Sequence, residues 1–178
     1  MKIIRISILF VVYALTFLTC SNKNSKLNQL LGSWQIEQVL DEKGNAVLEA
    51  SKKDSLIAQS VVNDRNYYQM NEIEFTAEDS IKSVQESENL LKILFETKYE
   101  FGKDGMYKVH SWNERENMTA VTLEGSYIFD EKTSSIERSV TRGDQKQDDK
   151  VTVEWLADGR MKMAIANNTQ FLVLKKVK

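Results

Sequence analysis

The sequence predicts a mainly β protein: an antiparallel up-and-down meander that closes into a small barrel, with one or two helices inserted after the first strand. Seven strand-like segments follow residue 95 with short connections between them, and strands connected in this way pair with their sequence neighbours. Several of these segments alternate apolar with polar residues, so the sheet has one apolar face that must be covered. Closing the sheet on itself covers that face, and a two-sheet sandwich is the alternative.

The first 19 residues are typical of an export signal. Lys2 and Arg5 precede an apolar run over residues 6–18, which is shorter than the roughly 20 residues that a membrane-spanning helix needs. Cys20, the single cysteine of the chain, follows this run. We therefore expect a signal peptide over residues 1–19, a flexible tether over residues 20–29 and a barrel domain over residues 30–178.

The composition after the signal peptide indicates one globular domain of mixed charge. From Cys20 onward the chain has 159 residues, which is enough for one hydrophobic core. It holds 22 Lys and Arg against 26 Asp and Glu, a net charge of about −4, and the two signs are interspersed. Because nucleic-acid binding needs a basic patch or stripe, we expect no nucleic-acid partner.

The first strand is expected over residues 30–40. Side chains alternate between the two faces of a strand, so Trp34, Ile36 and Leu40 should share one face and Val39 should lie on the other. Two interpretations of Trp34 are open: it plugs one end of a closed sheet, or it belongs to an ordinary half-buried strand that starts after Gly32.

The segment after the first strand contains the helical insertion. Residues 51–68 have approximate helical spacing, residues 70–76 alternate as a short strand would, and residues 78–94 give the clearest amphipathic helix. Thr76 and Asp79 have the spacing of a helix-capping pair. The apolar face of this helix is expected to lie against the rim or open end of the sheet.

From residue 95 to the end, the pattern is that of strands and turns. Asp104-Gly105 and Asp158-Gly159 predict tight hairpins of type I′, which need positive φ at both central residues. The expected strands span residues 95–101, 107–112, 120–129, 135–141, 150–156, 161–165 and 170–177.

A search for catalytic or metal-binding residues suggests neither an enzyme nor a cofactor. His110 is the only histidine, and strand alternation favours a surface or rim position over a role as general base. Met161 and Met163 point the same way in a strand, where core packing is favoured over a copper site. No glycine-rich phosphate loop and no set of nucleophile, base and orienting group is found in the sequence, so we expect no metal and no catalysis.

Two segments resemble known protein families, and the first contains the cysteine. Phe17-Leu18-Thr19-Cys20 resembles the processing box of bacterial lipoproteins. That resemblance implies that Cys20 is lipidated, becomes the mature first residue and anchors the chain in the cell envelope of a Gram-negative bacterium, at the outer membrane facing the periplasm.

The second resemblance is to the lipocalin-like (calycin) domains found in many bacterial lipoproteins. Leu31-Gly32-Ser33-Trp34 resembles the Gly-x-Trp that opens the first strand of that family. Residues 99–107, Tyr-Glu-Phe-Gly-Lys-Asp-Gly-Met-Tyr, are similar to its aromatic strand and Asp-Gly turn, and residues 125–129 and the Asp158-Gly159 hairpin fit its later part. The long insertion between Ala50 and Leu94 departs from the simplest form of the pattern.

The resemblance implies a scaffold that often holds a small apolar ligand in its interior. The aromatic residues of the alternating faces are the candidate ligand-binding residues: Trp34, Tyr99, Phe101, Tyr107, Tyr127 and Trp155. The alternative is a structural or interaction module, in which the barrel interior is filled and an outer surface or the inserted helix meets another envelope protein.

Overall fold

The computed structural model describes residues 25–113, 118–142, 145–165 and 169–178. The chain divides into two compact units, residues 1–30 and residues 31–178. Cys20, the predicted signal peptide and the first part of the predicted tether lie outside the described residues. The last residues of that tether and Leu30, the first residue of the expected first strand, form the short helix α2 (Lys26–Leu30).

The second unit consists of strands with a pair of helices between the second and the third. In chain order its elements are β1 (Gly32–Leu40), β2 (Ala46–Glu49), a short 3-10 helix (Ala50–Lys52), α3 (Lys53–Met70), α4 (Ala77–Phe95), β3 (Lys98–Phe101), β4 (Met106–Asn113), β5 (Met118–Asp130), β6 (Ser135–Arg142), β7 (Gln145–Trp155), β8 (Met161–Ile165) and β9 (Gln170–Val177). None of the described helices is both long and apolar enough to cross a membrane.

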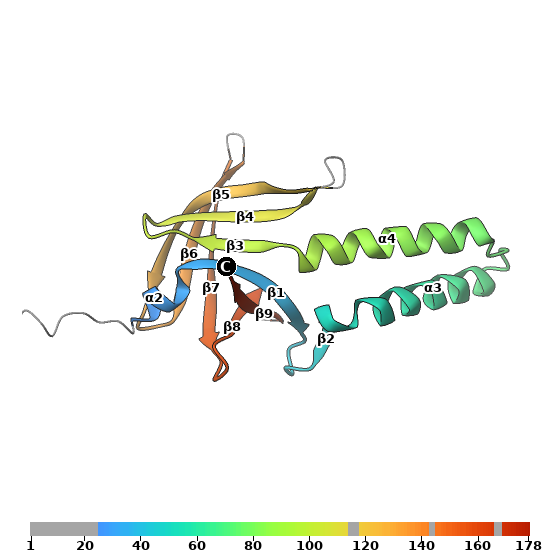
Figure 1. Cartoon of the computed structure of the whole chain (residues 1–178), viewed down its shortest axis with the longest axis horizontal. Helices are drawn as coiled ribbons and strands as arrows, with labels where there is room; N and C mark the ends of the chain where they lie inside the picture. Colours follow the sequence, from blue (N-terminus) through green and yellow to red (C-terminus); the bar gives the residue numbers. More distant parts are fainter. Residues whose placement is uncertain (1–24, 114–117, 143–144, 166–168) are drawn as a thin grey trace, which may run out of the picture. The chain divides into compact units, whose positions relative to one another are not determined.

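The described strands form one antiparallel sheet that closes into a barrel (Figure 1). Each strand from β3 to β9 pairs with its sequence neighbour, and β1 pairs with β3 on one side and β9 on the other. The register places Ser33 opposite both Glu100 and Val177, so the first and last strands complete the ring. β2 extends the sheet beside the later part of β1. The predicted mainly β, antiparallel closed barrel is confirmed, and the sandwich alternative is wrong.

All seven strands expected after residue 95 are present, and two of their bounds differ from the expected ones by three residues or more. Phe95 closes α4 and the strand begins at Lys98, whereas β7 begins at Gln145 within a stretch that was expected to be a loop. The inward side chains of the ring form the core. Its buried members are Trp34, Ile36, Phe101, Tyr107, Ile136, Val151, Val153, Met161, Met163, Leu172 and Leu174.

β1 departs from simple alternation because of a bulge. The register with β9 shifts between Ile36 and Gln38, so one extra residue of β1 faces its partner strand. Trp34 and Ile36 are buried as expected, but after the bulge Val39 is buried and Leu40 is half-buried. The expected grouping of Leu40 with Trp34 is therefore wrong, since a bulge reverses the facing of every residue that follows it.

The Asp-Gly turns occur where they were expected, but their type is different. Gly105 and Gly159 have φ of +77° and +84°, whereas the two preceding aspartates do not have positive φ. The Gly105 N–H donates to the Gly102 carbonyl at 3.2 Å, and the Gly159 N–H donates to the Leu156 carbonyl at 3.0 Å. These are type I turns that end in a left-handed glycine, so the prediction of type I′ is wrong.

Both predicted helices of the insertion are confirmed. The capping pair is present at the start of α4: the Asp79 N–H donates to Thr76 Oγ1 at 3.2 Å, and the Thr76 N–H donates to Asp79 Oδ2 at 2.9 Å. The short strand expected over residues 70–76 is wrong. This segment connects the two helices, has Glu72 at φ +56° and lies beside no other strand of the described chain.

α4 packs mainly against α3 rather than against the rim of the sheet. Its buried residues include two serines, of which Ser83 donates to Asp64 at 2.6 Å and Ser87 donates to Ser60 at 2.8 Å. The end of α4 meets the barrel, where the Gln35 amide donates to the Phe95 carbonyl at 2.7 Å. We refer to α3, α4 and their connection (residues 53–95) as the helical hairpin.

Candidate functional site

The interior of the barrel contains a cavity of about 300 Å³. The inward-facing side chains of β3 to β8 line it, which is why residues that are distant in the sequence meet there. The lining is Tyr99, Tyr107, Val109, Leu123, Arg138, Val140, Gln147, Asp149 and Ile165. A cavity with apolar walls and a few convergent polar groups is the usual form of a small-molecule site.

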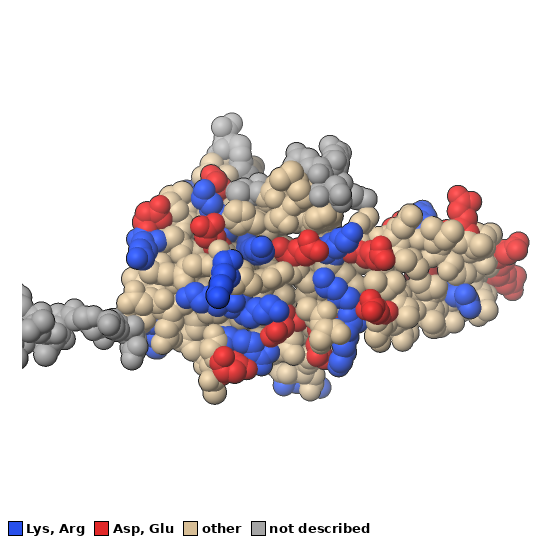
Figure 2. Space-filling model, viewed as in Figure 1, with Lys and Arg blue, Asp and Glu red and all other residues tan. Residues whose placement is uncertain are grey.

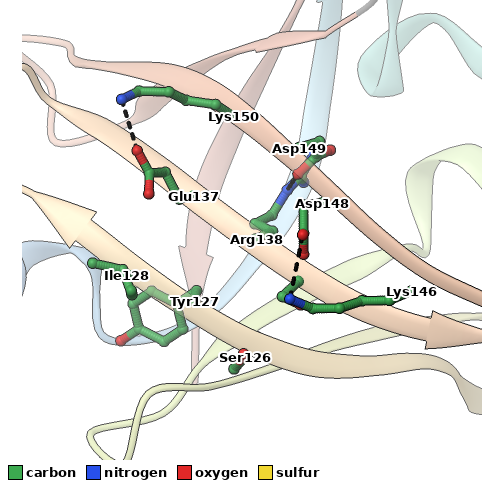
Figure 3. Close-up of a pocket in the computed structure, with 10 residues that line it drawn as sticks. Ser126, Tyr127, Ile128, Glu137, Arg138, Lys146, Asp148, Asp149 and Lys150 are labelled. Carbon is green, nitrogen blue, oxygen red and sulfur yellow. Dashed lines mark hydrogen bonds and ion pairs between the residues drawn. The ribbon is translucent and has the colours of Figure 1, made fainter.

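Arg138 and Asp149 are the charged groups of this cavity, and the Arg138 side chain is 13% exposed. It lies opposite Asp149 in the β6–β7 register, so the two side chains face each other across neighbouring strands (Figure 3). Arg138 Nε donates to Asp149 Oδ1 at 2.8 Å, Nη2 donates to Oδ2, and Nη1 donates to the Tyr107 hydroxyl at 3.1 Å. This two-point contact with a carboxylate fixes the plane of the guanidinium.

Burial and the hydrogen bonds have opposite effects on Arg138. Burial lowers the pKa of the guanidinium, but the bonds to Asp149 and Tyr107 outweigh burial, so its pKa is raised above its usual range. Arg138 therefore carries a full positive charge inside the barrel. The guanidinium carbon also lies 5.5 Å from the centre of the Tyr107 ring, at cation–π distance.

Tyr99 and Tyr107 form one wall of the cavity. Their rings stack with centroids 6.4 Å apart and an interplanar angle of 24°. Burial raises the pKa of both phenols, so both stay protonated at neutral pH and can donate a hydrogen bond. The Tyr107 hydroxyl already accepts from Arg138, whereas no hydrogen-bond partner is found for the Tyr99 hydroxyl within the described residues.

The other four predicted ligand-binding residues pack elsewhere in the barrel. Trp34 lies 5.6 Å from Trp155 between ring centroids, and Phe101 lies 5.2 Å from Tyr127. The Tyr127 hydroxyl donates to the Gly102 carbonyl at 2.8 Å. The structure thus brings Tyr99 and Tyr107 together at the cavity, and these four residues are not among its lining.

The polar lining residues were not anticipated from the sequence. Gln147 and Asp149 belong to the stretch that was expected to be a loop, which is the beginning of β7. Ile136, Arg138 and Val140 are two residues apart along β6, so they point to the same face of the strand, and Ile136 and Val140 are buried. The sequence could have indicated an inward-facing charge here, because an apolar residue lies two positions before the arginine and another two positions after it.

A second hollow, of about 470 Å³, is lined by residues of β5, β6 and β7 and shares Arg138 and Asp149 with the cavity (Figure 3). Its charged side chains are paired: Lys150 with Glu137 at 2.8 Å and Lys146 with Asp148 at 3.3 Å. Because the charges balance, this surface has no strong preference for either sign of ligand.

The remaining residues considered for chemistry have structural surroundings. His110 is 28% exposed, and its Nε2 lies 3.0 Å from Glu100 Oε2 on the neighbouring strand. Met161 and Met163 are completely buried in the core. Within the described part of the chain, no cluster of three or more His, Cys, Asp and Glu is arranged to hold a metal ion.

Comparison with known proteins gives little beyond the geometry. No family model matches the sequence, and no curated protein matches it. A crystal structure of a DUF4847 family protein from Bacteroides vulgatus is similar to this chain at 12% sequence identity and a TM-score of 0.47. The similarity covers 84% of this chain and 94% of that one. The architecture of the barrel rests on its strand pairing alone.

Proposed function

We propose that this protein is a lipid-anchored lipoprotein of the cell envelope whose barrel binds a small amphipathic ligand rather than catalysing a reaction. The observation that carries the proposal is the interior cavity around Arg138. The apolar part of the ligand lies against Val109, Leu123, Val140 and Ile165, and its polar end lies at the guanidinium.

The polar groups of the cavity have capacity for a ligand. A guanidinium has five N–H donors, and three of those of Arg138 are used by Asp149 and Tyr107. The Tyr99 hydroxyl adds another donor on the same wall. A ligand with an oxygen-rich end accepts hydrogen bonds from these donors. The volume of about 300 Å³ limits the ligand to a small one.

The proposed location follows from the sequence before the barrel. The short apolar run ending at Cys20 and the lipoprotein-like box support lipidation of this cysteine and attachment to the outer membrane, facing the periplasm. The resemblance to lipocalin-like domains of bacterial lipoproteins supports a ligand in the interior.

The test of ligand binding uses residues 21–178, which contain every described helix and strand. The purified protein is extracted with organic solvent and the extract examined by mass spectrometry, and fatty acids and haem-like compounds are then titrated against tryptophan fluorescence. Leu123→Trp fills the cavity from β5, whereas Ile128→Trp changes an exposed side chain of the same strand. We expect binding to be lost in the first variant and kept in the second.

Two results would contradict the proposal. One is that nothing is extracted and no compound of the panel changes the fluorescence. The other is that Leu123→Trp binds as tightly as the unchanged protein. Anchoring is tested separately with labelled palmitate in a Gram-negative host: we expect label on the full-length protein and none on Cys20→Ser, and an unlabelled protein would exclude lipidation.

A further inference from the structure

The helical hairpin holds more than half of the large apolar side chains that are exposed among the described residues. Of twelve large hydrophobic residues that are exposed among the described residues, seven lie in this hairpin. They are Val62, Tyr67, Met70, Ile73, Ile81, Leu90 and Ile93. An accumulation of exposed apolar side chains on one part of a protein indicates an interaction site.

One of these residues, Leu90, lines a groove of about 350 Å³ between α3, α4 and β2. Leucines from all three elements line it, namely Leu48, Leu56, Leu90, Leu91 and Leu94, with Gln59 and Asn63 among the polar residues. The hydrogen bonds between the two helices join Ser83 to Asp64 and Ser87 to Ser60, and the second of these pairs also lines the groove. Leu90 is 66% exposed.

The hairpin also carries the excess negative charge of the chain. Residues 53–95 hold four Lys and Arg against eight Asp and Glu, whereas the other residues from Cys20 onward hold 18 of each sign. Glu72, Glu74, Glu78 and Asp79 lie within eight residues at the connection between the helices. Figure 2 shows Asp and Glu side chains at this end of the hairpin, beside a largely uncharged surface.

From the leucine groove and the net charge of the hairpin, we propose that this surface docks a basic amphipathic helix of another envelope protein. An amphipathic helix presents apolar residues at i, i+3 or i+4 and i+7, which match a groove between two helices, while its Lys and Arg complement the acidic hairpin. A second copy of the hairpin has the same net charge of −4 and is repelled, and so is a membrane rich in anionic lipid. This inference is independent of the interior cavity.

The test is a binding measurement with a defined probe. A fluorescent 18-residue helical peptide with leucines along one face and lysines elsewhere is titrated against residues 21–178 by fluorescence anisotropy. A second peptide carries glutamate in place of every lysine. We expect the lysine peptide to bind at least tenfold more tightly than the glutamate peptide, and its binding to weaken as the salt concentration rises.

Protein variants locate the binding surface. Leu90→Ala removes an exposed groove side chain and should weaken binding of the lysine peptide about tenfold, as expected when a leucine is buried on binding. Glu86→Gln removes a charge one helical turn away and should weaken it less. Ile128→Ala and Glu137→Gln are the matched controls on the barrel, and they should leave binding unchanged.

Several outcomes overturn the proposal. They are equal binding of the two peptides, no binding of the lysine peptide at about 1 mM, or undiminished binding by Leu90→Ala. Analytical ultracentrifugation provides a further check. If the unchanged protein is a dimer and the Leu90→Ala variant is a monomer, a second copy of the chain occupies the groove. This result would also refute a basic partner.

Discussion

Replacing Asp149 with alanine should destabilise the barrel because it leaves the Arg138 charge in the cavity without its carboxylate partner. Removing one partner of a fully buried ion pair costs about 3–5 kcal/mol, and a surface pair is worth about 0–1 kcal/mol. This pair is intermediate, since the Arg138 side chain is 13% exposed and that of Asp149 is 44% exposed. After allowing for this solvent screening, we expect the free energy of unfolding to fall by about 1–2 kcal/mol.

The assay is urea unfolding of residues 21–178 at pH 7, followed by tryptophan fluorescence. With a slope of about 2 kcal/mol per molar, the midpoint of Asp149→Ala should fall by about 0.5–1 M. Asp148→Ala is the matched control, because the neighbouring aspartate lies on the outer face of β7 with a 63% exposed side chain, and its midpoint should change far less. Equal losses in the two variants would refute the reasoning.

A third variant distinguishes loss of a contact from an isolated charge. Arg138→Met combined with Asp149→Ala removes both charges and keeps an apolar side chain in the cavity. The double variant should recover part of the stability that Asp149→Ala loses, because the buried guanidinium no longer lacks a counter-charge. A double variant that is less stable by the sum of the two single losses would show that the two residues act independently.

Three other predictions concern separate parts of the fold. Gly125→Ala should lower the free energy of unfolding by about 1–3 kcal/mol, because a Cβ there would lie 2.2 Å from the Ser139 carbonyl oxygen; an unchanged urea midpoint would contradict this close approach. Thr76→Ala removes the helix cap that binds the Asp79 N–H and should cost about 1 kcal/mol, with faster amide exchange in the first turn of α4 as its local signature. Burial raises the pKa of Tyr107 above its usual value of 10.0, so the unfolded chain loses this proton first and stability should fall as the pH rises above that value. Unfolding measured between pH 8 and pH 11 should show a shallower loss in Tyr107→Phe, and an identical slope would count against it.

The architecture could be predicted because most of the signals are local and agree with one another. The alternation of Val151, Val153 and Trp155 identifies a strand with one apolar face, and the Thr76–Asp79 pair marks the start of α4 from a spacing of three residues. Asp158-Gly159 located a hairpin. It did not specify the turn type, because a glycine with positive φ suits both a type I′ turn and a type I turn that ends in a bulge.

The cavity could not be predicted because it depends on pairing between strands. The bulge near Ile36 is defined by the register with β9, which no residue of β1 reveals. Arg138 becomes the charged centre of the interior only when β7 places Asp149 opposite it, and the sequence of β7 before residue 150 is so polar that it resembles a loop. The contact between α3 and α4 likewise could not be predicted. The spacing of apolar residues places Ile81 on the buried face of the helix, but Ile81 is 60% exposed and serines form hydrogen bonds between the helices.

The pairing of β1 with β9 also determines when the ring can be completed. β1 is translated early and β9 late, so β1 can pair with β9 only when synthesis is nearly complete. Bringing the two strands together closes a long loop, and the entropy cost of closing it makes this step slow. Until then the lateral edge of β1 offers its amide and carbonyl groups to any other extended chain. Shielding of this edge by a holding chaperone would therefore be needed most in the interval before residues 170–177 are available to pair.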